Sequence, residues 1–343
     1  MKLENVSLSL LYIQRYFPLL HLAPSFCFQS MEFPETNNKL ITTLSFLLCM
    51  LSLTYASKNC DFPAIFNFGD SNSDTGGLAA AFSPPNSPFG ETFFHMPAGR
   101  YSDGRLIIDF IGAMFAESVP ERDYFEKALY TFDIGQNDLG AGFSGNLSVE
   151  EVNATVPDIV NSFSANVKKI YNLGARSFWI HNTGPLGCLA YIFESFPLAE
   201  KDSAGCAKAY NEVAQHFNLN LKESVAQLRK DLPLAVFTYV DIYSVKYSLF
   251  SEPEKHGFEL PLVVCCGYGG KYNFSSNVRC GDTVAANGTQ IVVGSCDRPS
   301  VRVNWDGVHY TEAANKFIFD QISTGAFSDP PIPLKMACHN TTH

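Results

Sequence analysis

A serine, an aspartate and a histidine carry the most distinctive chemistry of this sequence. Ser71 lies in the segment 68–77, Phe-Gly-Asp-Ser-Asn-Ser-Asp-Thr-Gly-Gly, and Asp306 and His309 occur together near the other end of the chain. A serine hydroxyl is a weak nucleophile until an imidazole accepts its proton, and that imidazole needs a carboxylate to fix its tautomer. We therefore predict that Ser71 is a nucleophile, His309 its general base and Asp306 the orienting acid.

Each of these segments also has a purely structural interpretation. The polar residues of 70–75 are typical of a turn or a helix cap, because their side chains bond nearby backbone N–H groups. Asp306 and Gly307 are likewise typical of a turn, here before a helix predicted over residues 311–322. A third segment, Gly-Gln-Asn-Asp at 135–138, favours catalysis because it supplies the Asn137 amide as an oxyanion donor. One such donor is worth ~3 kcal/mol of transition-state stabilisation.

The elements around these residues predict a doubly wound α/β fold with a mainly parallel sheet. Short apolar runs of the kind buried on both faces of such a sheet occupy residues 64–68, 129–134, 176–180 and 235–240. Longer stretches with helical periodicity lie between them, at 105–118, 156–173 and 203–229. Ligands of such folds bind beyond the carboxyl ends of the strands, where Ser71 and Asn137 are expected.

The composition predicts a globular protein without a nucleic-acid partner. The chain has 343 residues, of which 46% are hydrophobic and 17% charged, and its formal net charge is −10. Binding to a phosphate backbone needs a concentrated basic surface, and no basic cluster is present. Because no repeat or linker divides the rest of the chain, we predict one domain over residues 58–343.

The first 57 residues are predicted to be targeting sequence. Lys39 precedes an apolar run at 40–53, and small residues at 54–56 resemble a signal-peptidase site. A membrane anchor is the alternative interpretation, but the run is shorter than the ~20 residues that a bilayer needs. Met31 begins a segment of ordinary signal-peptide proportions, so residues 1–30 are interpreted as an upstream extension. The mature protein is expected to be secreted, in the extracellular space or cell wall.

The cysteines and sequons agree with secretion. Ten cysteines are present, and Cys27 and Cys49 fall within the predicted leader, so an even number remains for disulfide bonds. Zinc binding is the competing interpretation, but no Cys-x-x-Cys pair occurs. Candidate N-glycosylation sites in the mature part are Asn146, Asn153, Asn273, Asn287 and Asn340.

In series, these motifs resemble the plant secreted branch of the GDSL esterases and lipases, also called SGNH hydrolases, and its early nodulin-like and acetylesterase-like members in particular. The segments that carry the resemblance are 68–77, 131–138, 184–188, 265–267 and 305–309. The resemblance implies a flavodoxin-like three-layer α/β/α fold. It also implies hydrolysis of small-molecule or carbohydrate acyl esters through an acyl-enzyme, without metal or organic cofactor. Ser71, Asp306 and His309 would be catalytic, with Ser71 and Asn137 in the oxyanion hole.

The same resemblance implies a set of disulfide bonds. Cys188 is expected to pair with Cys206. The adjacent cysteines 265 and 266 are expected to pair with Cys280 and Cys296, in a combination that stays open. A bond between Cys60 and Cys338, near opposite ends of the mature chain, is a further hypothesis.

One part of the chain departs from the family pattern. The family carries a long segment between the counterparts of residues 103–105 and 135–138, and a glycine in it supplies a third oxyanion donor. Here residues 111–120 run almost directly into 121–129, and no counterpart of that glycine block is visible. We therefore expect a sheet that lacks one edge strand and an oxyanion hole that lacks one donor. Two hypotheses follow: a secreted serine ester hydrolase of acyl esters, acetyl esters among them, or a catalytically impaired or inactive secreted glycoprotein that retains the fold as a carbohydrate-binding or structural protein.

Overall fold

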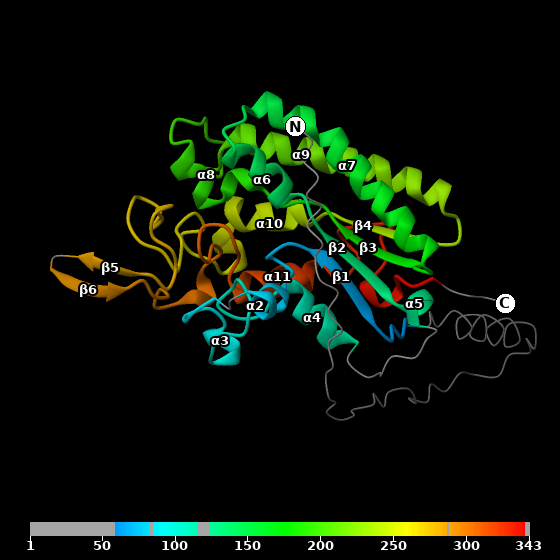
Figure 1. The fold of residues 1–343 in the computed structure, drawn as a ribbon, viewed down its shortest axis with the longest axis horizontal. Coiled ribbons are helices and arrows are strands. Elements are labelled where there is room, and N and C mark those ends of the chain that lie inside the picture. The colour runs from blue at the N-terminus through cyan, green and yellow to red at the C-terminus, as the bar shows by residue number, and fades with distance from the viewer. Residues whose placement is uncertain (1–58, 83–84, 116–123, 287, 340–343) are drawn as a thin grey trace, which may run out of the picture.

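A mainly parallel sheet forms the centre of the molecule (Figure 1). The computed structural model describes residues 59–82, 85–115, 124–286 and 288–339. Within these ranges the sheet has the order β1-β2-β3-β4-β7. Its strands are β1 (Ile65–Gly69), β2 (Leu129–Asp133), β3 (Ser177–His181), β4 (Val236–Val240) and β7 (Ser328–Asp329). The first four run parallel, and β7 is antiparallel to β4.

The four predicted strands are present, with bounds that differ from the prediction by one residue. They align so that Gly69, Asp133, His181 and Val240 lie side by side at the carboxyl edge of the sheet. Every residue of β2 and β3 is buried, as expected for strands that are covered on both faces. The residues that follow the parallel strands therefore share one edge.

One face of the sheet is covered by helices α6 (Gln136–Ser144), α7 (Val149–Asn172) and α9 (Lys208–Asp231) (Figure 1). Alternate strand side chains such as Tyr130, Phe178 and Phe237 belong to the core cluster on this side. The sequence fixes where α7 begins, because the Ser148 hydroxyl accepts from the backbone N–H of Glu151 while the Glu151 carboxylate accepts from that of Ser148.

The opposite face is covered by α4 (Ile107–Met114), α10 (Ile242–Ser251) and α11 (Glu312–Ile322). The intervening strand residues Leu129, Trp179 and Val240 pack into this second core cluster. The two-residue period of the strands thus supplies both layers. The predicted α/β fold, with a mostly parallel central sheet and helices on both sides, is confirmed.

Several shorter elements were not predicted. The helical ones are α2 (Gly77–Ala81), α3 (Glu91–Phe94), α5 (Tyr124–Lys127), α8 (Ala190–Ser195), η1 (Leu186–Cys188), η2 (Pro253–His256), η3 (Pro299–Val301) and η4 (Leu334–Met336). A separate hairpin, β5 (Thr283–Ala286) and β6 (Thr289–Val292), projects from the body of the molecule (Figure 1). All of β6 is exposed, so no apolar alternation marks it in the sequence.

Strand β1 lies at one edge of the sheet. Among the described residues it pairs with β2 and with no other strand. This agrees with the expected loss of an edge strand from the short connection after α4. Part of that connection, residues 116–123, lies outside the described residues. The glycine in α4, Gly112, has open space around the position of a β-carbon.

Four disulfide bonds join the eight cysteines of the described part. They are Cys60–Cys338, Cys188–Cys206, Cys265–Cys296 and Cys266–Cys280. The structure therefore contains the implied bond between Cys188 and Cys206. Of the two combinations left open for Cys265 and Cys266, it contains the one that pairs Cys265 with Cys296. The bond between Cys60 and Cys338 spans 278 residues and ties the two ends of the described chain together.

The sequons occupy different environments. Asn146 is exposed in a turn before α7, with a positive φ of 61°. Asn153 lies within α7 and contacts His216, whereas the Asn273 amide nitrogen donates to the Val264 carbonyl at 3.0 Å. Asn287 and Asn340 lie outside the described residues, as does the leader predicted over residues 1–57. In the described ranges no helix is both long enough and apolar enough to span a membrane.

Candidate active site

The turn that carries Ser71 begins where β1 ends. A side chain at Gly69 would collide with the Ser73 hydroxyl and with the Asp133 carbonyl, at 2.0 and 2.8 Å from its β-carbon, so glycine is required there. The Asp70 carboxylate accepts from the backbone N–H of Asn72 at 2.9 Å and from its side-chain amide at 3.2 Å. The polar residues of this segment thus form a turn, as their structural interpretation predicted, and Ser71 lies in that turn.

The loop before α11 presents the histidine and the aspartate. One Asp306 oxygen accepts from the backbone N–H groups of Val308 and His309 at 3.0 and 2.9 Å, which closes a tight turn. Gly307 has a φ of 98° and lies against the Phe274 ring, so a larger residue would not fit. The loop geometry follows from local chemistry that the sequence already contains.

Two short contacts connect the three side chains. The second Asp306 oxygen lies 2.7 Å from His309 Nδ1, and His309 Nε2 lies 2.6 Å from Ser71 Oγ. Because an ionised carboxylate only accepts, it favours the tautomer with the proton on Nδ1 and leaves Nε2 as the acceptor for the serine proton. The structure therefore brings Ser71, His309 and Asp306 together across 238 positions of sequence.

Asp306 and His309 change each other's pKa. Burial acts to raise the pKa of Asp306, but the adjacent His309 and the hydrogen bonds that Asp306 accepts hold that pKa below its ordinary value. Burial acts to lower the pKa of His309, but the Asp306 charge and, more weakly, Asp70 raise it above its ordinary value. The centre of the Tyr101 ring lies 5.2 Å from the centre of the imidazole, with the two ring planes at 31°. The pair is thus prepared to stabilise an imidazolium.

Asn137 lies at the same edge of the sheet. It is exposed in the first turn of α6, directly after β2, and the register of β1 and β2 places that strand end beside the turn of Ser71. Gly135 begins the helix with a φ of 107°, and a β-carbon there would meet the Phe217 ring at 2.7 Å. Gln136 donates to the Val308 carbonyl at 3.3 Å. This bond ties the start of α6 to the loop that carries His309.

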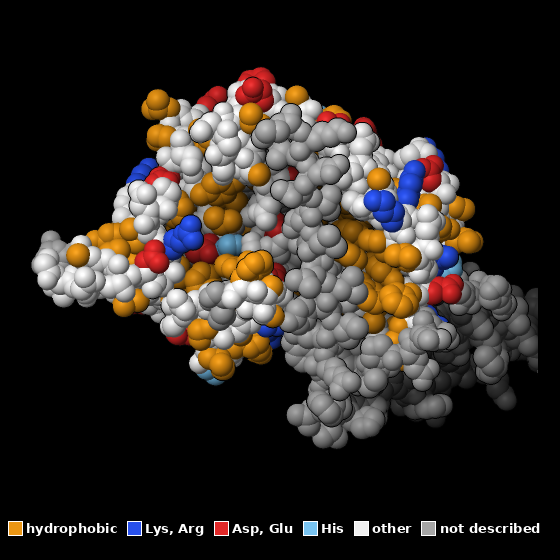
Figure 2. All heavy atoms as spheres, in the orientation of Figure 1, with side chains coloured by type: hydrophobic (Ala, Val, Ile, Leu, Met, Phe, Trp, Pro, Cys, Tyr) orange, Lys and Arg blue, Asp and Glu red, His pale blue; other side chains and the backbone are white. Residues whose placement is uncertain are grey.

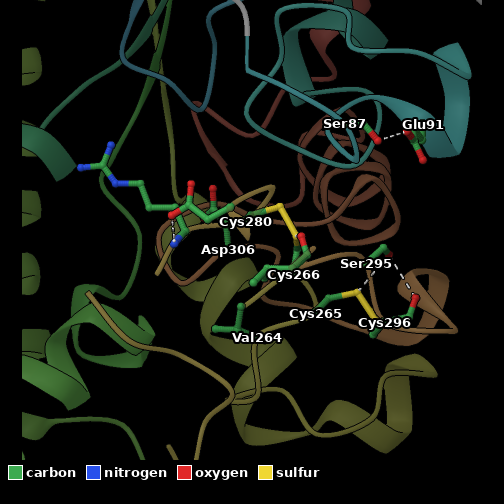
Figure 3. Close-up of a disulfide and its surroundings, with 12 residues drawn as sticks. Ser87, Glu91, Val264, Cys265, Cys266, Cys280, Ser295, Cys296 and Asp306 are labelled. Carbon is green, nitrogen blue, oxygen red and sulfur yellow. Dashed lines mark hydrogen bonds between the residues drawn. A yellow bond between two sulfur atoms is a disulfide. The ribbon is translucent and has the colours of Figure 1, made fainter. Parts of the chain in front are cut away.

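Disulfide-bonded loops support the histidine loop from outside. The backbone N–H groups of Cys265 and Cys266 donate to the carbonyls of Asn304 and Trp305, at 3.0 and 2.7 Å. Figure 3 shows both disulfides, of which Cys266–Cys280 is drawn next to Asp306 and Cys265–Cys296 farther from it. The segment 265–267, singled out in the sequence, therefore positions the loop that contains Asp306.

Sequence reasoning missed a set of buried ionisable residues beneath this edge. Burial, followed by the charge of Asp133, raises the pKa of Asp70 to about 6. Burial lowers the pKa of His181 to about 4. Lys246, on α10, is only 2% exposed. The available signal was a charged residue within an otherwise apolar segment, as with Asp133 in β2 and Lys246 in α10.

Exposed apolar side chains lie on the segment that follows the nucleophile turn. Leu78 and Phe82 belong to α2 and its C-terminal end, and Phe93 and Met96 to α3 and the residues after it. Figure 2 shows hydrophobic side chains on the face of the molecule that carries α2 and α3. The backbone bond from Gly90 to Ser102 places α3 beside the segment that contains Tyr101.

Comparison with known proteins agrees with this geometry. The sequence profile of the GDSL-like lipase/acylhydrolase family matches residues 65–322. The chain is 66% identical to an esterase from Hevea brasiliensis, over 91% of this chain and 98% of the relative. It is 51% identical to the GDSL esterase/lipase ENOD8 from Medicago truncatula, over 88% and 96% of the two chains. It is 44% identical to a protein named alpha-L-fucosidase 3 from Arabidopsis thaliana, over 81% and 95%.

The alignment with the Hevea brasiliensis esterase is longer than the present chain. It extends over 383 positions, although the present chain has 343 residues in all. The relative therefore carries residues that have no counterpart here. This agrees with the expectation that a segment present in similar proteins is absent from this chain.

Proposed function

The chain belongs to the GDSL-like lipase/acylhydrolase family and is a serine ester hydrolase, and from this premise we propose that Ser71 cleaves acyl esters through an acyl-enzyme. The observation that carries the proposal is the 2.6 Å contact between Ser71 Oγ and His309 Nε2. This distance is within the range for proton transfer from a nucleophile to its base. The substrate would be a small-molecule or carbohydrate acyl ester.

In the first step, Ser71 Oγ attacks the ester carbonyl while its proton passes to His309. The new imidazolium is stabilised by Asp306, which already hydrogen-bonds Nδ1 at 2.7 Å. His309 then returns the proton to the leaving alcohol, and the acyl group remains on Ser71. In the second step, water attacks this ester while His309 takes one of its protons, and His309 passes that proton to Ser71 Oγ as the acyl–oxygen bond breaks and the acid is released. Both steps use only protein groups and water.

The negative charge that develops on the carbonyl oxygen needs hydrogen-bond donors. The Ser71 backbone N–H and the Asn137 amide are the two that we assign. The turn at Gly69 and the helix start at Gly135 support this assignment, because they fix the backbone on either side of the same strand pair. A hole with two donors in place of three would give a slower enzyme, since one donor contributes roughly 10²- to 10³-fold in rate.

The apolar residues beside the turn suit the acyl part of a substrate. Leu78 and Met96 are 43% and 62% exposed. The segment that contains these two side chains lies near Tyr101, whose ring is 5.2 Å from the His309 ring. An acyl chain that leaves the carbonyl on this side would bury apolar surface, at ~25 cal/mol per Å². Short and medium acyl chains are therefore expected to be accepted.

We further propose that the protein is secreted and glycosylated. The four disulfide bonds are typical of an oxidising compartment. Asn146 is the described sequon best suited to carry a glycan, because it is exposed in a turn. Asn273 is less suited, since its amide nitrogen already donates to Val264.

The test compares the purified protein with a Ser71→Ala variant on p-nitrophenyl acetate and butyrate, with Ser323→Ala as a matched surface control. The wild type and the control should hydrolyse both esters, and a fluorophosphonate probe should label them on Ser71. Ser71→Ala should be inactive and unlabelled. p-Nitrophenyl α-L-fucoside serves as a comparison substrate, because one similar protein is named a fucosidase.

Two outcomes would contradict the proposal. Equal ester hydrolysis by the wild type and Ser71→Ala would remove Ser71 from the mechanism. A folded wild type that is neither active on esters nor labelled by the probe would instead support the inactive glycoprotein. The fucoside tests a separate activity: its cleavage by Ser71→Ala would assign a glycosidase activity to residues other than Ser71.

A further inference from the structure

Three ionisable side chains lie buried beneath the proposed active site. Lys246 is 2% exposed, Asp133 is 9% exposed and His181 is 3% exposed. One carboxylate oxygen of Asp133 has no hydrogen-bond partner among the described residues. Burying an unpaired charge is strongly unfavourable, so such groups persist only where other charges offset them. Their charges must therefore be balanced within the site.

The position of Lys246 is set by its neighbours. Its stem passes Gly184, where an added β-carbon would come within 2.8 Å of the lysine Cδ. The ammonium nitrogen lies 4.7 Å from the centre of the Tyr310 ring. Tyr310 directly follows His309 in the chain. The lysine thus extends from α10 under the loop that carries the proposed base.

The buried charges interact with both catalytic segments. Lys246 interacts electrostatically with Asp70, with His181 and with His309. Asp133 interacts with Asp70 and His181, and also with Tyr310. The other titratable groups around this cluster are Asp306 and Tyr101 beside His309, and Tyr243 beside Tyr310.

His181 does not supply positive charge to this cluster. Its Nε2 accepts a hydrogen bond from the Trp179 indole N–H at 3.0 Å, which requires that nitrogen to be unprotonated. Burial lowers the pKa of His181 to about 4. His181 is therefore neutral near pH 7, and Lys246 is the buried lysine whose charge lowers the pKa of Asp70.

We propose that Lys246 is a positioning residue of this active site, whose buried ammonium group beneath the His309 loop offsets the negative charges of Asp70, next to Ser71, and of Asp133. The inference rests on the proposed function of Ser71 and His309. An ionised Asp70 strengthens the two hydrogen bonds that Asn72 donates to its carboxyl group and that hold the turn. His309 needs to be neutral to accept the serine proton.

The sign of the effect does not depend on where a proton binds. The active form has Asp70 ionised and His309 neutral: a proton on His309 removes the base, and a proton on Asp70 weakens the hydrogen bonds that hold the Ser71 turn. A buried cation opposes the addition of that proton at both sites. Removing the cation must favour protonation, and removing the Asp133 charge must disfavour it.

The experiment uses three variants of the full-length protein and one control. Lys246→Met keeps the length of the side chain without its charge, Asp133→Asn removes one carboxylate, and the double variant removes both. Lys168→Met is the control, because Lys168 is an exposed lysine paired with Asp231 on the far side of the sheet. kcat/KM for p-nitrophenyl acetate and the rate of fluorophosphonate labelling are measured from pH 5 to 9.

In Lys246→Met, the acid limb of the kcat/KM profile and that of the labelling profile should move to higher pH. The expected shift is ~1 pH unit, the size of the effect of a nearby buried charge. The acid limb should move to lower pH in Asp133→Asn and return close to that of the wild type in the double variant. Lys168→Met should leave the limb in place. If Lys246→Met does not fold, the shift in Asp133→Asn and the recovery in the double variant test the same charge balance.

A role of Lys246 in packing alone predicts a different pattern. Activity would then change by the same factor at every pH, and Asp133→Asn would not restore it. That result, with an active wild type and an inactive Ser71→Ala, would overturn the inference and leave the proposed function intact. If Ser71→Ala stays active, the proposed function fails instead.

Discussion

Polar residues follow the strands at both ends of the carboxyl edge of the sheet, but the residues at the two ends have different hydrogen-bond partners. Beyond β1 and β2 lie Ser71 and Asn137, which follow the strands in exposed or half-buried turns. Beyond β3 and β4 lie Asn182 and Asp241, in the same relation to their strands. Sequence pattern alone treats both pairs as polar residues at the ligand-binding edge of an α/β sheet.

The difference lies in where the hydrogen bonds go. Asn182 donates to the Tyr239 hydroxyl and to Asp241, both at 3.0 Å, and accepts from the Tyr243 backbone N–H at 2.8 Å. Its amide is therefore saturated by the protein itself. The Ser71 hydroxyl contacts the imidazole of His309, and the Ser71 side chain is half-buried and not enclosed like that of Asn182.

This contrast teaches a way to separate chemistry from structure at one edge. A polar side chain that is saturated internally stabilises the fold, because unpairing it leaves buried groups without partners. A polar side chain held in place by its backbone, with its reactive atom turned to a base, is available to a substrate. Substitutions after β1 and β2 should therefore change activity, whereas substitutions after β3 and β4 should change stability.

The largest effect is expected at Asp306. Asp306→Asn should lower kcat/KM for short-chain aryl esters by roughly 10⁴-fold, because the amide fixes the wrong tautomer of His309 and does not stabilise the imidazolium. Asp320→Asn, which changes an exposed aspartate on α11, is the matched control. A loss below tenfold would show that Asp306 does not orient the base.

A smaller loss is expected at Asn137. Asn137→Ala should lower kcat by roughly 10²- to 10³-fold with KM little changed, because an oxyanion donor acts in the transition state. Thermal unfolding should be unaffected, since the side chain is exposed. Asn166→Ala, on the surface of α7, provides the comparison. An effect confined to KM would place Asn137 in ground-state binding.

The pH dependence of the wild type should follow His309. The Asp306 charge raises the pKa of His309 above 6.5 against the effect of burial. Since the neutral imidazole is the base, kcat/KM should fall tenfold per unit as the pH decreases below that raised pKa. The midpoint of the acid limb is therefore expected above 6.5. A midpoint clearly below 6.5 would contradict the assigned pair.

The smallest effect on activity is expected on the β4 side. Asn182→Ala should leave kcat/KM of the folded enzyme within about twofold and lower the free energy of unfolding by about 1–3 kcal/mol, because Tyr239 and the Tyr243 backbone lose a buried partner. Urea denaturation monitored by circular dichroism measures this change. If Asn182→Ala instead removes activity and keeps stability, the contrast between the two ends does not hold.

Much of the fold was predictable because its signals are local. The apolar runs in the first four strands and the periodicity of α9 reflect burial that a short segment records by itself. The β7 strand was missed because its two residues form no pattern, and the β5–β6 hairpin because its side chains are largely exposed. Helices α6 and α10 were missed because the apolar residues of these two segments do not recur at a clear helical spacing.

The sequence by itself determined which residues could form a hydrolytic site and the local turns that hold them. Gly69, Asp70 and Asp306 shape the turns through contacts with residues only a few positions away. These turns can therefore be predicted from the local sequence. Tertiary structure alone decided that Ser71 meets His309 across 238 positions, and that Cys265 pairs with Cys296 and not with Cys280. It also decided that Lys246 is buried beneath them. The physical reason is that desolvation and long-range pairing depend on which distant segments pack together, and no local pattern contains that information.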